Sequence, residues 1–178
     1  NGRNRIYDAA ILVRRRKNEI CNIVFSKVEE YCQQLVPGED ENEDEYWQQD
    51  IVSLDEIGLV DLYEYEGQLA LDRMVALAEE LHRIALESLV VRVASLIDED
   101  PFDVRLPIHA RQLSRAFQQS METVGVSLEA APVVLEYYSQ HVIRPLDGYY
   151  QPLNAYLARN GVKPNVEQQV LDSGSLLQ

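Results

Sequence analysis

The sequence contains no apolar run near the ~20 residues that a membrane-spanning helix needs, so we expect no membrane partner. It has no strand-rich region and no internal repeat. G-x-S-x-G, P-loop and G-x-G-x-x-G motifs and paired C-x-x-C motifs are also missing. We therefore predict no catalytic residue, no metal ligand and no cofactor, and an enzyme of unidentified class ranks third among the functional hypotheses.

Cysteine is scarce, with only Cys21 and Cys32 among 178 residues. Both fall on a predicted helix, on one face but about 16 Å apart along its axis. They cannot bond to each other without breaking that helix. We expect two buried free thiols in a cytoplasmic protein.

Lysine and arginine are absent from residues 36–66, which carry twelve Asp and Glu. Residues 1–35 instead have a net charge of +3, and the whole chain has a net charge of −14. Such acidity argues against a nucleic-acid partner or an anionic membrane surface. Six mutually repelling acids in residues 39–45 predict an acidic linker, and Trp47 beside them either packs back on the core or marks a docking point.

Two stretches carry apolar residues at three- and four-residue steps, which is typical of amphipathic helices. The stripe of the helix expected over 4–35 consists of Ile6, Ala10, Val13, Ile20, Val24, Val28, Tyr31 and Leu35. The stripe of the helix expected over 61–97 consists of Leu71, Met74, Ala78, Leu81, Ala85, Leu89, Val93 and Leu96. The first could pair with a partner copy, and the second is so long that we expect it to bend near Glu79–His82.

Prolines and glycines mark the later helices. Pro107 suits a first helical turn and Gly125 a helix end. Ser127 is the expected cap of a long run that contains Pro145 and Pro152.

These patterns predict an all-α fold, a bundle of four to six helices with one long central helix and a proline-kinked C-terminal helix. The expected organisation is a basic amphipathic helix over 1–36, an acidic linker over 37–50, a helical bundle core over 51–164 and a peripheral tail over 165–178.

Three motifs in order resemble a known family: Gly58 to Leu71, Pro101 to Phe117, and LNAYL with NGVKP in residues 153–164. At these spacings the chain is similar to the middle of the proteobacterial domain-of-unknown-function family 1631, over about residues 55–165. The N-terminal helix fits less clearly. The resemblance implies a cytoplasmic, internal helical module of a larger protein, with no established activity and no catalytic residues to carry over.

Several polar clusters have competing interpretations. Glu79-x-x-His82 has the spacing of helical di-iron sites, but no second copy exists, so a helix-surface pair is the preferred reading. Arg111-x-x-x-Arg115 is better read as a solvated face. Arg14, Arg15, Arg16 and Lys17 form a basic turn, either a solvated face or a docking point for an acidic segment.

The tyrosines Tyr137, Tyr138, Tyr149 and Tyr150 occur as two adjacent pairs, so one member of each must face outward or sideways. They belong either to the core or to a protein interface. The candidate interface residues are Arg14, Arg15, Arg16, Lys17, Trp47, Tyr138 and Tyr150. The leading hypothesis is a non-enzymatic interaction or regulatory module with a protein partner or self-association. The alternative is a sensor that binds a small, nucleotide-like molecule between the central and kinked helices.

Overall fold

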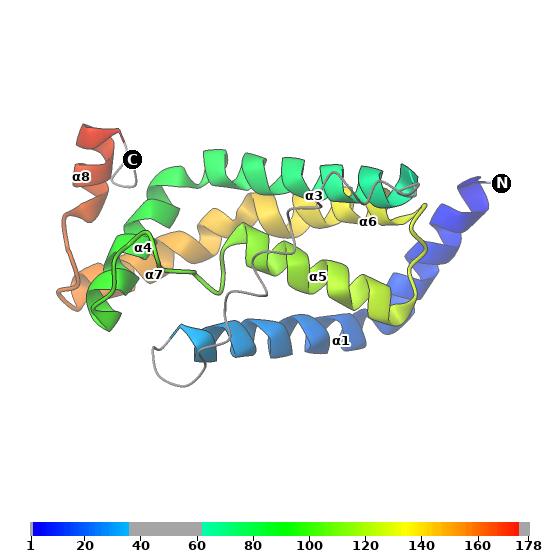
Figure 1. Cartoon of the computed structure of the whole chain (residues 1–178), viewed down its shortest axis with the longest axis horizontal. Coiled ribbons are helices and arrows are strands. Elements are labelled where there is room, and N and C mark those ends of the chain that lie inside the picture. The colour runs from blue at the N-terminus through cyan, green and yellow to red at the C-terminus, as the bar shows by residue number, and fades with distance from the viewer. Residues whose placement is uncertain (1, 36–61, 175–178) are drawn as a thin grey trace, which may run out of the picture.

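The computed structural model describes residues 2–35 and 62–174, and within them it contains helices and no strand. The α-helices are α1 (Gly2–Gln34), α3 (Leu62–Leu81), α4 (Arg83–Ile97), α5 (Ala110–Val124), α6 (Ala131–Tyr138), α7 (Asp147–Arg159) and α8 (Val166–Ser173). α1, α5 and α3 lie side by side, the α6–α7 run lies behind α3 and α4, and α8 stands at the end opposite the N-terminus (Figure 1). The predicted all-α class is confirmed. No helix in the described ranges is long and apolar enough to cross a membrane.

The predicted central helix is two helices, α3 and α4, with His82 between them. The break falls in the expected Glu79–His82 region. Leu71, Ala78, Ala85 and Leu89 are buried as the periodicity predicts. Leu81, however, is 55% exposed, because it lies about 80° around the helix from Leu71, whereas His82 lies only about 20° from Leu71 and is buried instead.

The apolar stripe of α1 packs against its own chain, mainly along α5. Ile20 is buried in the core, and Val13 and Val24 pack against it. Cys21 and Cys32 are exposed, so the expectation of buried thiols is wrong. They lie outside the stripe that contacts α5.

The helix α5 begins three residues later than Pro107 predicts, at Ala110. His109 is its N-cap, and the His109 Nδ1 accepts a hydrogen bond of 3.1 Å from the backbone N–H of Arg111. A neutral imidazole can therefore cap a helix, although histidine is not among the preferred capping residues. The predicted end is confirmed, since Gly125 has φ +80° at the C-cap.

The run expected over 127–164 changes helix type at its first internal proline. α6 is followed by a π-helical turn, η3 (Ser139–Ile143), a 3₁₀ turn, η4 (Arg144–Leu146), and then α7. Pro145 lacks the N–H that an α-helix would use there, and a local change of hydrogen-bond pattern accommodates it. Pro152 lies inside α7. The N-cap of α6 is Ala130 and not Ser127. The backbone carbonyl of Ser127 accepts hydrogen bonds from the backbone N–H groups of Ala130 and Ala131.

The segment expected to be a peripheral tail contains α8, which packs against α4. Val166 and Val170 are 1% and 0% exposed. Burying a valine side chain stabilises a fold by about 1.5–3 kcal/mol. The tail is therefore an integral part of the packing. The predicted linker over 37–50 and the stretch over 51–60 lie outside the described residues.

Candidate functional site

The two tyrosine pairs divide into buried and outward members, as adjacency on a helix requires. Tyr138 is 9% exposed and Tyr150 is fully buried. Their hydroxyls donate to the carbonyls of Leu113 (3.1 Å) and Ile108 (2.8 Å). Burial raises the pKa of both phenols above the ordinary value, so both stay protonated hydrogen-bond donors.

The choice of Tyr138 and Tyr150 as interface residues is therefore wrong, because their side chains lie inside the fold. Tyr138 stacks on Phe117 with ring centroids 3.9 Å apart. The outward members are Tyr137 and Tyr149. Sequence alone could not choose between the members of each pair, because both lie within an apolar helical run.

The outward side of α7 carries three large side chains in helical register. Tyr149, Leu153 and Tyr156 are 69%, 41% and 61% exposed. They follow one another at steps of four and three residues, which places them along one side of the helix. This α7 face, defined by Tyr149, Leu153 and Tyr156 with the exposed small residues Gly148, Pro152 and Ala155 beside them, is the candidate site.

The inner side of α7 is held by polar bonds as well as by packing. Asn154 is 2% exposed, and its side-chain amide donates to the carbonyl of Ala85 on α4 at 2.9 Å. Its side-chain oxygen accepts from Arg92 Nη1 at 2.5 Å. Together with the Tyr150 hydroxyl bond, these contacts fix the rotation of α7 and so determine which residues face outward.

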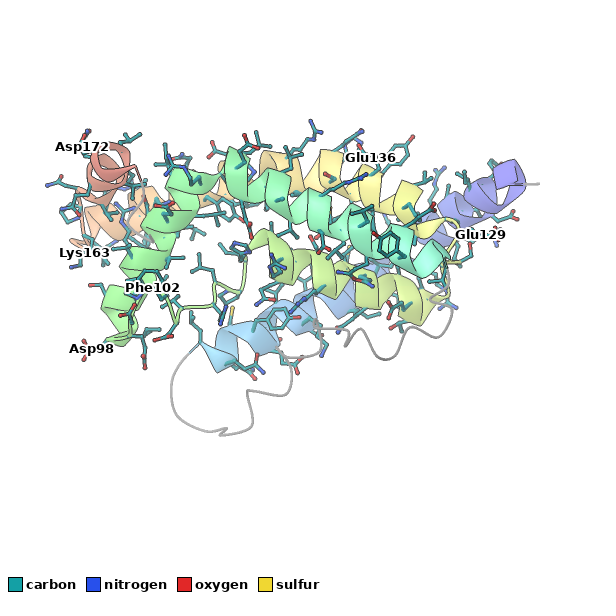
Figure 2. All side chains as sticks on the ribbon, turned by 45° about the horizontal axis from the view of Figure 1, so that its top comes forward. Asp98, Phe102, Glu129, Glu136, Lys163 and Asp172 are labelled. Carbon is teal, nitrogen blue, oxygen red and sulfur yellow. The ribbon has the colours of Figure 1, made fainter. Side chains whose placement is uncertain are left out.

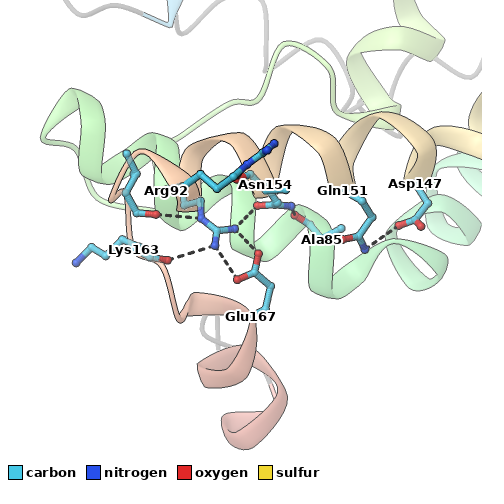
Figure 3. A network of polar contacts seen from close by, with 10 residues as sticks. Ala85, Arg92, Asp147, Gln151, Asn154, Lys163 and Glu167 are labelled. Carbon is cyan, nitrogen blue, oxygen red and sulfur yellow. Dashed lines mark hydrogen bonds and ion pairs between the residues drawn. The ribbon is translucent and has the colours of Figure 1, made fainter.

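Arg92 lies at the centre of a polar network (Figure 3). Its guanidinium is fully buried and joins three parts of the chain. Nε donates to Val162 O (3.1 Å), Nη2 donates to Lys163 O (3.3 Å), and both terminal nitrogens contact the carboxylate of Glu167 on α8. With Asn154, these acceptors account for all five N–H groups of the guanidinium.

This network is structural, since every donor of Arg92 is already used within the fold. The hydrogen bond from Arg92 lowers the pKa of Glu167 from its ordinary value, which keeps the carboxylate charged. Sequence reasoning missed Arg92, Asn154 and Glu167. The available signal was an arginine inside the apolar run of α4, where a charge needs buried partners.

Glu79 and His82 do not act as a pair. His82 Nε2 lies 3.0 Å from the carbonyl of Ile143, in the π-helical turn. Glu79 instead approaches His109 Nε2 (3.8 Å) and Arg111 (3.6 Å) on α5. Across residues 2–35 and 62–174, no group of three or more His, Cys, Asp or Glu side chains is arranged to hold a metal ion.

The basic turn Arg14, Arg15, Arg16 and Lys17 is exposed on α1. Arg16 pairs with Glu19 one turn away at 2.5 Å. An exposed pair of this kind contributes at most about 1 kcal/mol. A docking role for this turn stays a prediction, and Trp47 lies outside the described residues.

Two shallow hollows occur near the place where the sensor alternative expects a pocket. One, of about 270 Å³, lies between the α3–α4 break and the start of α7, beside His82 and Asp147. The other, of about 170 Å³, lies between α3 and α6, beside Arg73 and Ser139. Both are smaller than the ~300–1,000 Å³ of typical small-molecule sites, so the α7 face is the stronger candidate.

Fold and site together define an all-α domain that presents an aromatic helix face. Residues 1–161 match the family model described as Protein of unknown function (DUF1631) N-terminal domain. The chain therefore belongs to this family. The match includes the N-terminal helix and corresponds to the N-terminal domain, not the middle as the motifs indicated. No curated protein and no solved structure matches the chain.

Proposed function

We propose that this chain is a non-enzymatic protein-interaction module of a larger bacterial cytoplasmic protein, and that the α7 face contacts its partner. The observation that carries the proposal is the exposure of Tyr149, Leu153 and Tyr156 along one side of a single helix. Tyrosine is enriched at protein interfaces because its ring supplies contact area and its hydroxyl tolerates water.

The rigid attachment of α7 supports the same proposal. Tyr150 and Asn154 hold the helix from its inner side through bonds to Ile108 and Ala85. A surface that is already ordered loses little conformational entropy on binding, so more of the contact energy is retained as affinity. The buried members of the tyrosine-rich run thus position the exposed ones.

A pull-down tests the proposal. The chain is immobilised and exposed to lysate of a bacterium that encodes it, in parallel with the double variant Leu153→Ser/Tyr156→Ser. We expect the wild-type chain to retain a protein that the double variant does not. Both replaced side chains are exposed, so circular dichroism and melting temperature should change little.

The matched control is Tyr65→Ser on α3. Tyr65 is 60% exposed, nearly the same as Tyr156, but lies on a different helix. Equal retention by the wild type and the double variant, or equal loss with Tyr65→Ser, would show that the α7 face is not the contact surface.

A further inference from the structure

The smaller of the two hollows, between α3 and α6, is lined by two arginines. Arg73 comes from α3 and Arg144 from the start of η4, and the hollow beside them has a volume of about 170 Å³. Both residues are exposed, and within residues 2–35 and 62–174 neither side chain forms a hydrogen bond or an ion pair. An anion in this hollow would be attracted by both charges.

A buried hydroxyl group lines the same hollow. Ser139, the first residue of the π-helical turn η3, is only 5% exposed. In the part of the chain that the structure describes, its hydroxyl has no hydrogen-bond partner. The buried hydroxyls of Ser114 and Ser120, by contrast, each donate to a backbone carbonyl at 2.6 Å. Because a buried hydroxyl without a partner is unfavourable, a hydrogen-bond acceptor that enters the hollow would satisfy Ser139.

The π-helical turn explains why Ser139 and Arg144 line one hollow. The backbone N–H of Arg144 donates to the carbonyl of Ser139, five residues earlier, so the two residues lie one turn apart. At the 100° per residue of an α-helix they would lie about 140° apart around the axis. π-helical turns within helices occur frequently at functional sites. The irregular turn before Pro145 therefore also shapes this hollow.

The donors of the hollow suit an oxyanion. Guanidinium groups bind carboxylate and phosphate oxygens, and a serine hydroxyl can donate one further hydrogen bond. A phosphate group presents oxygens in several directions, so it can accept from donors on separate elements, whereas both oxygens of a carboxylate lie in one plane. The remaining lining residues are Ala70, Met74, Leu77, Leu135 and Glu136.

The charge of the lining residues also favours an anion. Glu136 is the acid among them, and its Oε1 accepts a hydrogen bond from Gln140 Nε2 at 2.9 Å. With two arginines and one glutamate, the lining residues have a net charge of +1. The whole chain has a net charge of −14, so this hollow is a locally positive place on an acidic protein.

We propose that this hollow binds a phosphate-type oxyanion, held by the guanidinium groups of Arg73 and Arg144 and by the hydroxyl of Ser139. Its volume lies below the ~300–1,000 Å³ of typical small-molecule sites. The ligand is therefore inorganic phosphate, or a phosphoryl group whose remainder lies outside the hollow. None of the three residues belongs to α7, so the inference is independent of the proposed protein-interaction surface.

An amide NMR titration of the full chain with sodium phosphate at pH 7 tests the proposal, with ionic strength held constant by sodium chloride. We expect saturable shifts around residues 139–144 and around Arg73, with a dissociation constant of about 1 mM or below. A second titration, with glycerol phosphate, distinguishes the two sources. Similar affinity for both compounds identifies a phosphoryl group as the ligand, and binding of inorganic phosphate alone identifies the free ion.

Ser139→Ala is the key variant, because it removes a hydroxyl that the chain itself does not use. The dissociation constant should rise at least about tenfold, whereas the melting temperature without phosphate should not fall. Ser88→Ala is the matched control. Ser88 is fully buried and its hydroxyl also has no partner, but Ser88 does not line the hollow. This control should bind phosphate as the wild type does.

Arg144→Gln tests the contribution of charge. It should also raise the dissociation constant at least about tenfold. Arg14→Gln, at an exposed position on α1, makes the same change in net charge and should leave the affinity nearly unchanged.

Three results would overturn the proposal. One is the absence of saturable shifts up to about 20 mM phosphate. Another is a set of shifts that sodium chloride alone reproduces. The third is an affinity that Ser139→Ala and Arg144→Gln reduce no more than their controls do.

Discussion

The fully buried guanidinium of Arg92 on α4 meets the carboxylate of Glu167 on α8 through both of its terminal nitrogens. The same guanidinium holds the backbone between α7 and α8 through Val162 O and Lys163 O. Figure 2 shows Lys163 and Asp172 together at this end of the molecule. The Arg92–Glu167 pair therefore holds together the end of the fold at which α7 ends.

Replacing Arg92 should destabilise the fold. Arg92→Met leaves the buried Asn154 side-chain oxygen without this donor, whereas the side chain of Glu167 is 36% exposed and can be hydrated. We therefore expect a loss of about 1–3 kcal/mol, the cost of leaving buried polar groups without partners. Glu167→Gln should lower the free energy of unfolding by about 1–2 kcal/mol. This loss is moderate because the glutamine side-chain oxygen can still accept a hydrogen bond from Arg92. Urea unfolding followed by circular dichroism measures both. Glu122→Gln, at an exposed position on α5, is the control. If the Arg92 and Glu167 variants lose no more unfolding free energy than Glu122→Gln does, the Arg92–Glu167 pair does not stabilise the fold.

The contribution of Glu167 should depend on pH. Its pKa is lowered in the folded chain by the hydrogen bond from Arg92, from an ordinary value of 4.5. The unfolded chain therefore takes up this proton first as the pH falls. The stabilisation is present above about pH 4.5 and is lost below it. The difference in unfolding free energy between wild type and Glu167→Gln should shrink as the pH is lowered from about 6 to about 3–4. A difference that stays constant over this range would show that the Glu167 carboxylate does not cause the pH dependence.

His109 should give the fold a second pH dependence in a different range. Burial lowers the pKa of His109 from 6.5, with Glu79 opposing and Arg111 reinforcing the shift. Protonation of Nδ1 would also remove the acceptor that caps α5. The free energy of unfolding should therefore fall as the pH drops below about 6.5. His109→Asn keeps a capping side chain but does not titrate, so its profile should be flatter between pH 7 and pH 5. Identical profiles would show that this histidine is not responsible.

The hydroxyl of Tyr150 should be worth a measurable fraction of the stability. Tyr150→Phe removes the bond to Ile108 O inside the fold, and we expect a loss of about 1 kcal/mol. Tyr149→Phe is the matched control, because Tyr149 is 69% exposed. Thermal unfolding of the two variants compares them directly. Equal melting temperatures would mean that the buried hydroxyl does not anchor α7.

Much of the fold could be predicted because its helices follow simple periodic patterns. The stripe through Leu71, Ala78 and Leu89 identified a buried helical side, and Gly125 marked a helix end. Helix starts were less predictable. His109 and Ala130 are not common caps, so the sequence favoured Pro107 and Ser127 instead.

The polar anchors could not be predicted because they join residues far apart in the chain. Arg92 and Glu167 are 75 residues apart, and only the folded backbone brings them together. The same limit applied to Tyr149 and Tyr150, since the rotation of α7 depends on those distant bonds. Which side of α7 faces outward could therefore be determined only from the folded structure.

Site-specific photo-crosslinking tests most directly whether the α7 face contacts another protein chain. p-Benzoylphenylalanine replaces Tyr149 in one version of the full chain and Tyr65 in the other, two exposed tyrosine positions on different helices. Irradiation is carried out in cells that produce the chain. We predict a crosslinked protein product at position 149, of doubled mass if the partner is a second copy, and none at position 65. Absence of a product at 149, or equal products at both positions, would contradict the claim.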